Sequence, residues 1–364
     1  MSAAVLGKAY NFAPIARIKM ISNVEVKSMT ISLSRILGLG GSLALLLATH
    51  AVLGEEYKPP RLANGQPDLQ GVWTIASLTS MTRSRQHSDL VIPQELAERT
   101  AEGREAANER ALQPTDPNAP APSAGGGGVG GYNSFWMDPG SSYAKINGEY
   151  RSSWIVEPAD GQLPYTAKGL QVFNEQAALY RNHVDNPEGR PMAERCIIGY
   201  GSTGGPPMNN VLYNNNYQFI QNDDHVVIVV EMNHDARIIR LNDEHRPESI
   251  RPWLGDSVGY WDGDTLVVKT KNINHGERLR LNFNQSFYLS ENVEIEERFT
   301  RAADDYILYE YTVTDPEIYS KPWRAQVRLS AVDGHIFEYA CHEGNYALPG
   351  ILAGARLEEQ EADK

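Results

Sequence analysis

The chain has 364 residues, with 33 lysines and arginines against 46 aspartates and glutamates, which gives a formal net charge of −13. Its 41% hydrophobic and 22% charged residues are typical of globular proteins, and at roughly 100–200 residues per domain its length allows one large domain or two modest ones. The negative charge and the lack of any basic run exclude a nucleic-acid-binding protein, which needs lysine and arginine to neutralise phosphates.

Residues 1–54 are predicted to be a signal peptide with an upstream extension. Thirteen apolar or small residues, from Ile36 to Ala48, follow a single nearby cation, Arg35. This run is too short to cross ~30 Å of hydrocarbon, which needs roughly 20 residues, and it is typical of the core of a secretory signal peptide. An uncleaved membrane anchor is the alternative. We therefore expect a periplasmic or secreted protein with no membrane association after signal cleavage.

Residues 55–131 are predicted to form an extended and helical N-terminal region. Helix formers dominate from Pro93 to Leu112, with proline at the start and acidic residues early, and the apolar positions there are few and small. We therefore expect one surface helix. Residues 114–131 are rich first in proline and alanine and then in glycine, so they cannot bury apolar area and are predicted to be a linker.

Residues 132–364 are predicted to form a β-barrel-like domain. Short runs of β-branched and aromatic residues alternate with turn residues at roughly 8–12-residue spacing, and Asp262-Gly263 between two such runs is typical of a type I′ hairpin turn. The last expected strand covers residues 335–343. We expect a mainly β protein whose antiparallel meander closes into a lipocalin/calycin-like barrel, because closure removes exposed strand edges.

Two cysteines, Cys196 and Cys341, lie far apart in the sequence. In an exported protein an even pair is more often bridged than free, so we expect a disulfide. The chain-entropy model gives such a long loop ~4–5 kcal/mol of stabilisation before strain is subtracted. Two buried free thiols, or a nucleophilic Cys341 beside His342, are the alternatives.

Neither a nucleotide-binding motif nor a zinc motif is complete in this sequence. Residues 199–204 match G-x-G-x-x-G, but Gly205-Pro206-Pro207 follows, and a helix that binds pyrophosphate could not continue through these residues. No histidine pair has the H-E-x-x-H spacing of a zinc site. We therefore expect no cofactor and no metal, although the fold could still assemble a metal site from scattered side chains.

Glu297 is the first candidate catalytic residue. In residues 292–300 it shares one strand face with Val293, Ile295 and Phe299, so its side chain is expected to point inward. A carboxylate in such a place is either paired, or protonated with a raised pKa that suits a general acid or base. An ion pair with an interior arginine, Arg237 or Arg240, is the alternative.

Further candidates lie at two predicted strand ends, where polar residues gather. Histidine is the side chain best suited to proton transfer near neutral pH. A barrel mouth is also where a ligand usually enters, and tryptophans could line it. The expected catalytic residues are His234, His342, Glu231, Glu297 and Glu343, and the expected substrate-binding residues are Arg237, Asn345, Trp253 and Trp261.

Several motifs together carry a family resemblance. They include PWLGDSVGYWDGDTLVV at 252–268, EYACHEGN at 338–345, and the group Glu231, His234 and Arg237. With these motifs the chain resembles a large, mostly uncharacterised family of exported β-rich bacterial proteins. The resemblance implies an exported β-rich protein. It implies no activity, so no catalytic residue follows from it.

Two functions are consistent with these features. One is an exported enzyme that acts on a small organic molecule by cofactor-independent acid/base chemistry, of the lyase, hydratase or isomerase type, since the sequence offers no convincing nucleophile. The other is a periplasmic small-molecule binding or carrier protein that uses the same pocket without catalysis. In both cases the expected partner is a small molecule.

Overall fold

The structure, a computed structural model, describes residues 57–113, 118, 137–182, 184–280 and 286–362. The predicted signal peptide and nearly all of the predicted linker lie outside these residues. Residues 55–364 form one compact unit. No helix within the described ranges is both long and apolar enough to span a membrane.

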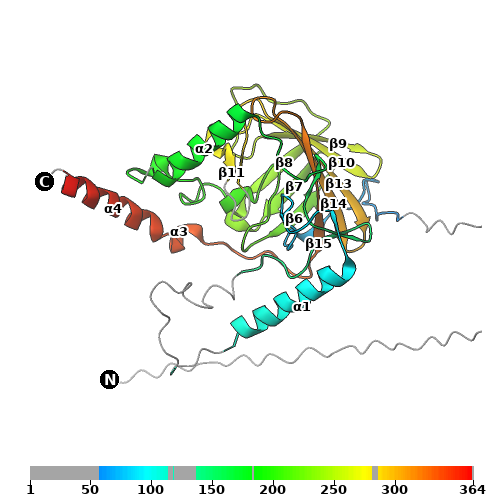
Figure 1. Ribbon diagram of the computed structural model, residues 1–364. Helices are drawn as coiled ribbons and strands as arrows, with labels where there is room; N and C mark the ends of the chain where they lie inside the picture. Colours follow the sequence, from blue (N-terminus) through cyan, green and yellow to red (C-terminus); the bar gives the residue numbers. More distant parts are fainter. Residues whose placement is uncertain (1–56, 114–117, 119–136, 183, 281–285, 363–364) are drawn as a thin grey trace, which may run out of the picture. The chain divides into compact units, whose positions relative to one another are not determined.

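Nine strands close into a barrel, which confirms the predicted fold class (Figure 1). The ring closes because the C-terminal end of β15 pairs with β1. A tenth strand, β5 (Ile155–Glu157), lies outside the ring and pairs with the N-terminal end of β15. In order around the ring, the strands are β1 (Gly71–Thr74), β6 (Asn216–Gln221), β7 (His225–Val230), β8 (Ala236–Leu241), β9 (Asp256–Asp262), β10 (Thr265–Lys271), β13 (Glu294–Ala303), β14 (Tyr306–Thr314) and β15 (Trp323–Ala331).

The meander is interrupted between β8 and β9, which run parallel and pair only over Ile239–Leu241 and Ser257–Gly259. A ring of strands that all alternate in direction needs an even number, so a ring of nine requires a parallel pair. The connection between two parallel strands must return along the length of the barrel. Residues 242–255 make this return, and most of them are exposed, so the connection runs along the outside of the barrel.

The barrel interior is filled by inward-facing side chains. Alternate residues of β13 and β14, including Glu297, Phe299 and Tyr309, are fully buried. The backbone N–H of Met208 donates to the Tyr309 hydroxyl at 3.0 Å, so the buried segment 203–209 reaches the same interior. The end of the glycine-rich loop that matched a nucleotide motif therefore continues into the core, although Tyr200 in that loop is exposed.

Short elements surround the barrel. The predicted surface helix is confirmed as α1 (Gln94–Ala111), in which only Ala97 is buried among its residues. The sequence did not indicate the other helices. One of them, α2 (Ala167–Asn182), packs against β11 (Leu279–Arg280) and β12 (Phe287–Tyr288). The remaining elements are β2 (Val91–Ile92), β3 (Lys145–Ile146) and β4 (Glu149–Arg151) in one small sheet, β11 (Leu279–Arg280) and β12 (Phe287–Tyr288) in another, the helices α2 (Ala167–Asn182), α3 (Cys341–Gly344) and α4 (Ala347–Ala362), and four 3-10 turns at 187–189, 200–202, 232–234 and 275–277.

The prediction of a final strand over 335–343 is wrong. Residues 332–340 form no ladder, and the chain then enters α3. The two ends of β15 already pair with β1 and β5, and the Gln326 N–H between them donates to the carbonyl of Trp154, so no continuous edge is left for another strand. We call residues 332–345 the C-terminal strap.

Candidate functional site

Glu297 lies at the centre of the barrel in a buried ion pair. Its carboxylate accepts hydrogen bonds from both terminal nitrogens of Arg237, with Nη1 to Oε1 at 3.0 Å, and from the Tyr309 hydroxyl at 2.6 Å. Both charged side chains are at most 1% exposed. Burial, and then the negative charge of Glu297, raise the pKa of Tyr309 well above its usual value. The ion-pair alternative for Glu297 is thus confirmed, and its partner is Arg237.

Glu231 and His234 hold the C-terminal strap. The carboxylate of Glu231, which is 3% exposed, accepts from the side-chain amides of Asn214 and Asn216 at 2.6 and 2.9 Å, and from the backbone N–H of Phe337 at 3.4 Å. His234 Nε2 accepts from the backbone N–H of Tyr339 at 3.3 Å. His234 therefore positions the backbone of the strap, and Glu231 binds two asparagine side chains together with one backbone N–H of the strap.

The predicted disulfide between Cys196 and Cys341 is confirmed, with a Cα–Cα distance of 5.8 Å. It fixes the end of the C-terminal strap to the segment that precedes the buried loop. Asn345 strengthens this attachment, because its amide donates to the carbonyl of Glu194 at 2.6 Å. The ring of Tyr339 stacks on that of Tyr213, and burial raises the pKa of Tyr339 to about 12.

Within the described ranges, the five candidate catalytic residues do not share a pocket. Glu297 lies inside the barrel, whereas Glu231 and His234 lie under the strap. His342 and Glu343 are exposed on α3. Of the four candidate substrate-binding residues, Asn345 belongs to the strap and Trp261 packs partly buried against the core, while Trp253 and Arg237 line one pocket.

That pocket lies where β8 and β9 separate, and we call it the seam pocket. It has a volume of about 340 Å³. It exists because β8 pairs with β9 only from Ile239 onward, so the first half of β8 leaves a gap that residues 252–255 border. The lining residues are Ile197, Ile198, Asp235, Ala236, Arg237, Ile238, Arg240, Arg246, Pro252, Trp253, Leu254, Gly255, Asp256 and Ser257.

One wall of the seam pocket is apolar and open to solvent. Ile238 is 57% exposed and Trp253 is 39% exposed. Ile197, Ile198 and Leu254 extend the same lining. Large apolar side chains gathered in a concave surface are typical of small-molecule sites, because a ligand buries them.

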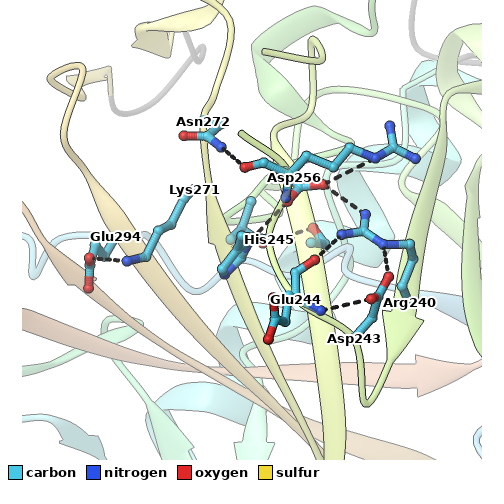
Figure 2. Close-up of polar contacts among 11 residues, drawn as sticks. Arg240, Asp243, Glu244, His245, Asp256, Lys271, Asn272 and Glu294 are labelled. Atoms are coloured by element: carbon cyan, nitrogen blue, oxygen red, sulfur yellow. Dashed lines mark hydrogen bonds and ion pairs between the residues drawn. The ribbon is translucent and has the colours of Figure 1, made fainter. Parts of the chain in front are cut away.

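Asp256 is the centre of a hydrogen-bond network at the polar side of the pocket (Figure 2). Although it is only 2% exposed, it accepts from Arg240 Nη1 at 2.8 Å, from His245 Nδ1 at 3.0 Å and from the backbone N–H of Arg246 at 2.9 Å. Burial acts to raise the pKa of Asp256, but these hydrogen bonds outweigh it and lower the pKa. Asp256 is therefore ionised at neutral pH.

Arg240 extends this network along residues 242–255. Its Nε donates to Asp243 at 2.5 Å and its Nη2 donates to the carbonyl of Glu244 at 2.7 Å. Sequence reasoning missed Asp256, His245, Arg240 and Arg246 as site residues. His245 and Arg246 belong to the dense charged run at 243–246, and that run could have indicated these two, but no such signal marks Arg240 or Asp256.

No group of three histidine, cysteine, aspartate or glutamate side chains among the described residues is placed to hold a metal ion. The polar side of the seam pocket instead carries the hydrogen bonds and salt bridges of Arg240 and Asp256, with the Arg246 guanidinium 3.9 Å from Asp256. Comparison with protein-family models, with curated proteins and with solved structures finds no match for this chain.

Proposed function

We propose that this protein binds a small organic molecule in the seam pocket and does not transform it. The observation that carries the proposal is a pocket of about 340 Å³ in which the apolar residues Trp253 and Ile238 face a polar side organised around Asp256. This combination of volume, apolar wall and few oriented polar groups is typical of ligand sites. The separation of the acid/base candidates favours binding over catalysis.

A second candidate function is acid/base catalysis of the lyase, hydratase or isomerase type. One observation favours it, namely that the Asp256 carboxylate bonds to Nδ1 of His245 at 3.0 Å. A carboxylate in this position orients an imidazole, which leaves Nε2 for proton exchange with a substrate. The His245 side chain is 23% exposed, so solvent reaches it.

We also propose that the protein acts outside the cytoplasm. The apolar run at 36–48 and the disulfide between Cys196 and Cys341 both support export, since disulfides persist mainly in oxidising compartments. Fractionation of cells that express the tagged chain tests this. Recovery in the periplasm or medium is expected, and recovery with reduced cysteines in the cytoplasm would contradict it.

The binding proposal is tested by ligand capture. The purified chain is incubated with a low-molecular-mass extract of the growth medium, separated from unbound compounds and analysed by mass spectrometry. We expect the wild type to retain compounds that Trp253→Ala loses and that Trp261→Ala, outside the pocket, keeps. Equal retention by Trp253→Ala, or no retention by the wild type, would refute the proposal. Conversion of a compound that is abolished by His245→Ala would establish the catalytic alternative.

A further inference from the structure

The guanidinium of Arg246 makes a long ion pair with Asp256, on a backbone that hydrogen bonds hold in place. The backbone N–H of Arg246 donates to Asp256 at 2.9 Å, and its carbonyl accepts from the Asn272 amide at 3.1 Å (Figure 2). The side chain, in contrast, is 52% exposed, and its Nε lies 3.9 Å from Asp256 Oδ1, beyond hydrogen-bonding distance. Within the described part of the chain, no hydrogen bond engages the guanidinium.

The other charged groups that line the seam pocket are already bonded to the protein. Arg237 is paired with Glu297, and Arg240 is bonded to Asp243, Asp256 and the carbonyl of Glu244. Asp235 accepts from the backbone N–H of Gly199 at 2.6 Å, and Asp256 accepts from three donors. Arg246 is thus an exposed lining residue whose guanidinium makes no hydrogen bond within the described part of the chain, whereas the unbonded Nε of Arg237 is buried.

We propose that the ligand of the seam pocket is an amphipathic monocarboxylate. Its apolar body would lie against Trp253 and Ile238, and its carboxylate would accept two hydrogen bonds from Arg246. The planar guanidinium matches a carboxylate in this bidentate way. A doubly charged phosphate is disfavoured by the nearby carboxylates of Asp235 and Asp256. This inference rests on the proposed function, since it names the ligand class of the same pocket.

The test compares two probes that differ only in the head group, 3-phenylpropionate and 3-phenylpropan-1-ol. Isothermal titration calorimetry of the full chain at pH 7 should show the carboxylate binding about tenfold more tightly, which corresponds to ~1.4 kcal/mol. Arg246→Gln should remove this preference and leave the affinity for the alcohol unchanged. Arg85→Gln removes the same charge from an exposed residue that does not line the pocket, and it should leave both affinities unchanged.

The outcomes separate the ligand class from the binding function. If the wild type binds both probes equally, or if Arg246→Gln keeps the preference for the carboxylate, the assignment of a carboxylate is overturned and the pocket stands as a binding site. If neither probe binds at millimolar concentration, the pocket is not a binding site, and both proposals fail. Circular dichroism of Arg246→Gln establishes that the variant is folded.

Discussion

Removing one partner of the buried pair of Arg237 and Glu297 should cost the barrel much of its stability. Glu297→Gln removes the negative charge and nearly preserves side-chain volume, so the Arg237 guanidinium is left charged at 1% exposure. The change also removes the charged acceptor of the Tyr309 hydroxyl, which now donates to Glu297 at 2.6 Å. The cost therefore comes from an uncompensated buried charge more than from the loss of any single hydrogen bond.

Breaking a buried ion pair by removing one partner costs about 3–5 kcal/mol. Native proteins are stable by only about 5–15 kcal/mol, so Glu297→Gln should lose a large part of the stability. The double variant Arg237→Met/Glu297→Leu removes both charges. We expect it to be more stable than Glu297→Gln alone, because no isolated charge is left in the core.

Urea unfolding followed by far-UV circular dichroism measures these differences. The matched control is Asp262→Asn, which breaks an ion pair with Arg298 at 2.9 Å whose side chains are 60% and 36% exposed. Exposed pairs contribute about 0–1 kcal/mol, so this variant should unfold near the wild-type midpoint. If Glu297→Gln costs no more than Asp262→Asn, the reasoning about the buried pair is refuted.

Three further predictions concern the pocket and the strap. Because folding lowers the pKa of Asp256, its ionised carboxylate stabilises the folded state above the ordinary pKa of 3.8, and this stabilisation is lost as the pH falls through the lower pKa of the folded state. The difference in free energy of unfolding between wild type and Asp256→Asn should therefore narrow below about pH 4. A difference that does not change with pH would contradict this. Replacing Cys196 and Cys341 by serine should cost about 4–5 kcal/mol in urea unfolding and expose residues 332–345 to limited proteolysis, and an unchanged cleavage pattern would count against the strap. His234→Ala should speed amide hydrogen exchange at Tyr339, whose N–H it otherwise binds, without changing exchange in the barrel strands.

Features that depend on local sequence pattern were predictable. The alternation in residues 292–300 places Glu297 inward, as the structure does, and the turn at Asp262-Gly263 joins β9 to β10. The pairing of Cys196 with Cys341 followed from compartment and count. Each of these conclusions needs only the period of a strand, the chemistry of a turn, or the parity of cysteines.

Features that depend on distant segments were not predictable. β1 is only four residues long, so its pattern is too short to show that it closes the barrel against β15. Together with β5, it interrupts the edge of β15, so residues 335–343, which have strand-like composition, find no continuous edge there. The seam pocket combines residues near 197, 237 and 254. It also depends on the parallel pairing of β8 with β9, and no local sequence pattern predicts that pairing.

The central claim, that the ligand binds at the seam between β8 and β9 and stays outside the filled barrel, is tested most directly by fluorine NMR. Replacing tryptophan by 5-fluorotryptophan labels all six tryptophans of the chain, among them Trp253 in the seam pocket and Trp73, Trp154 and Trp323 in the core. Titration with 3-phenylpropionate should move the Trp253 resonance and leave those of the three core tryptophans in place. Movement of the core resonances with an unmoved Trp253 would place the ligand inside the barrel and contradict the account.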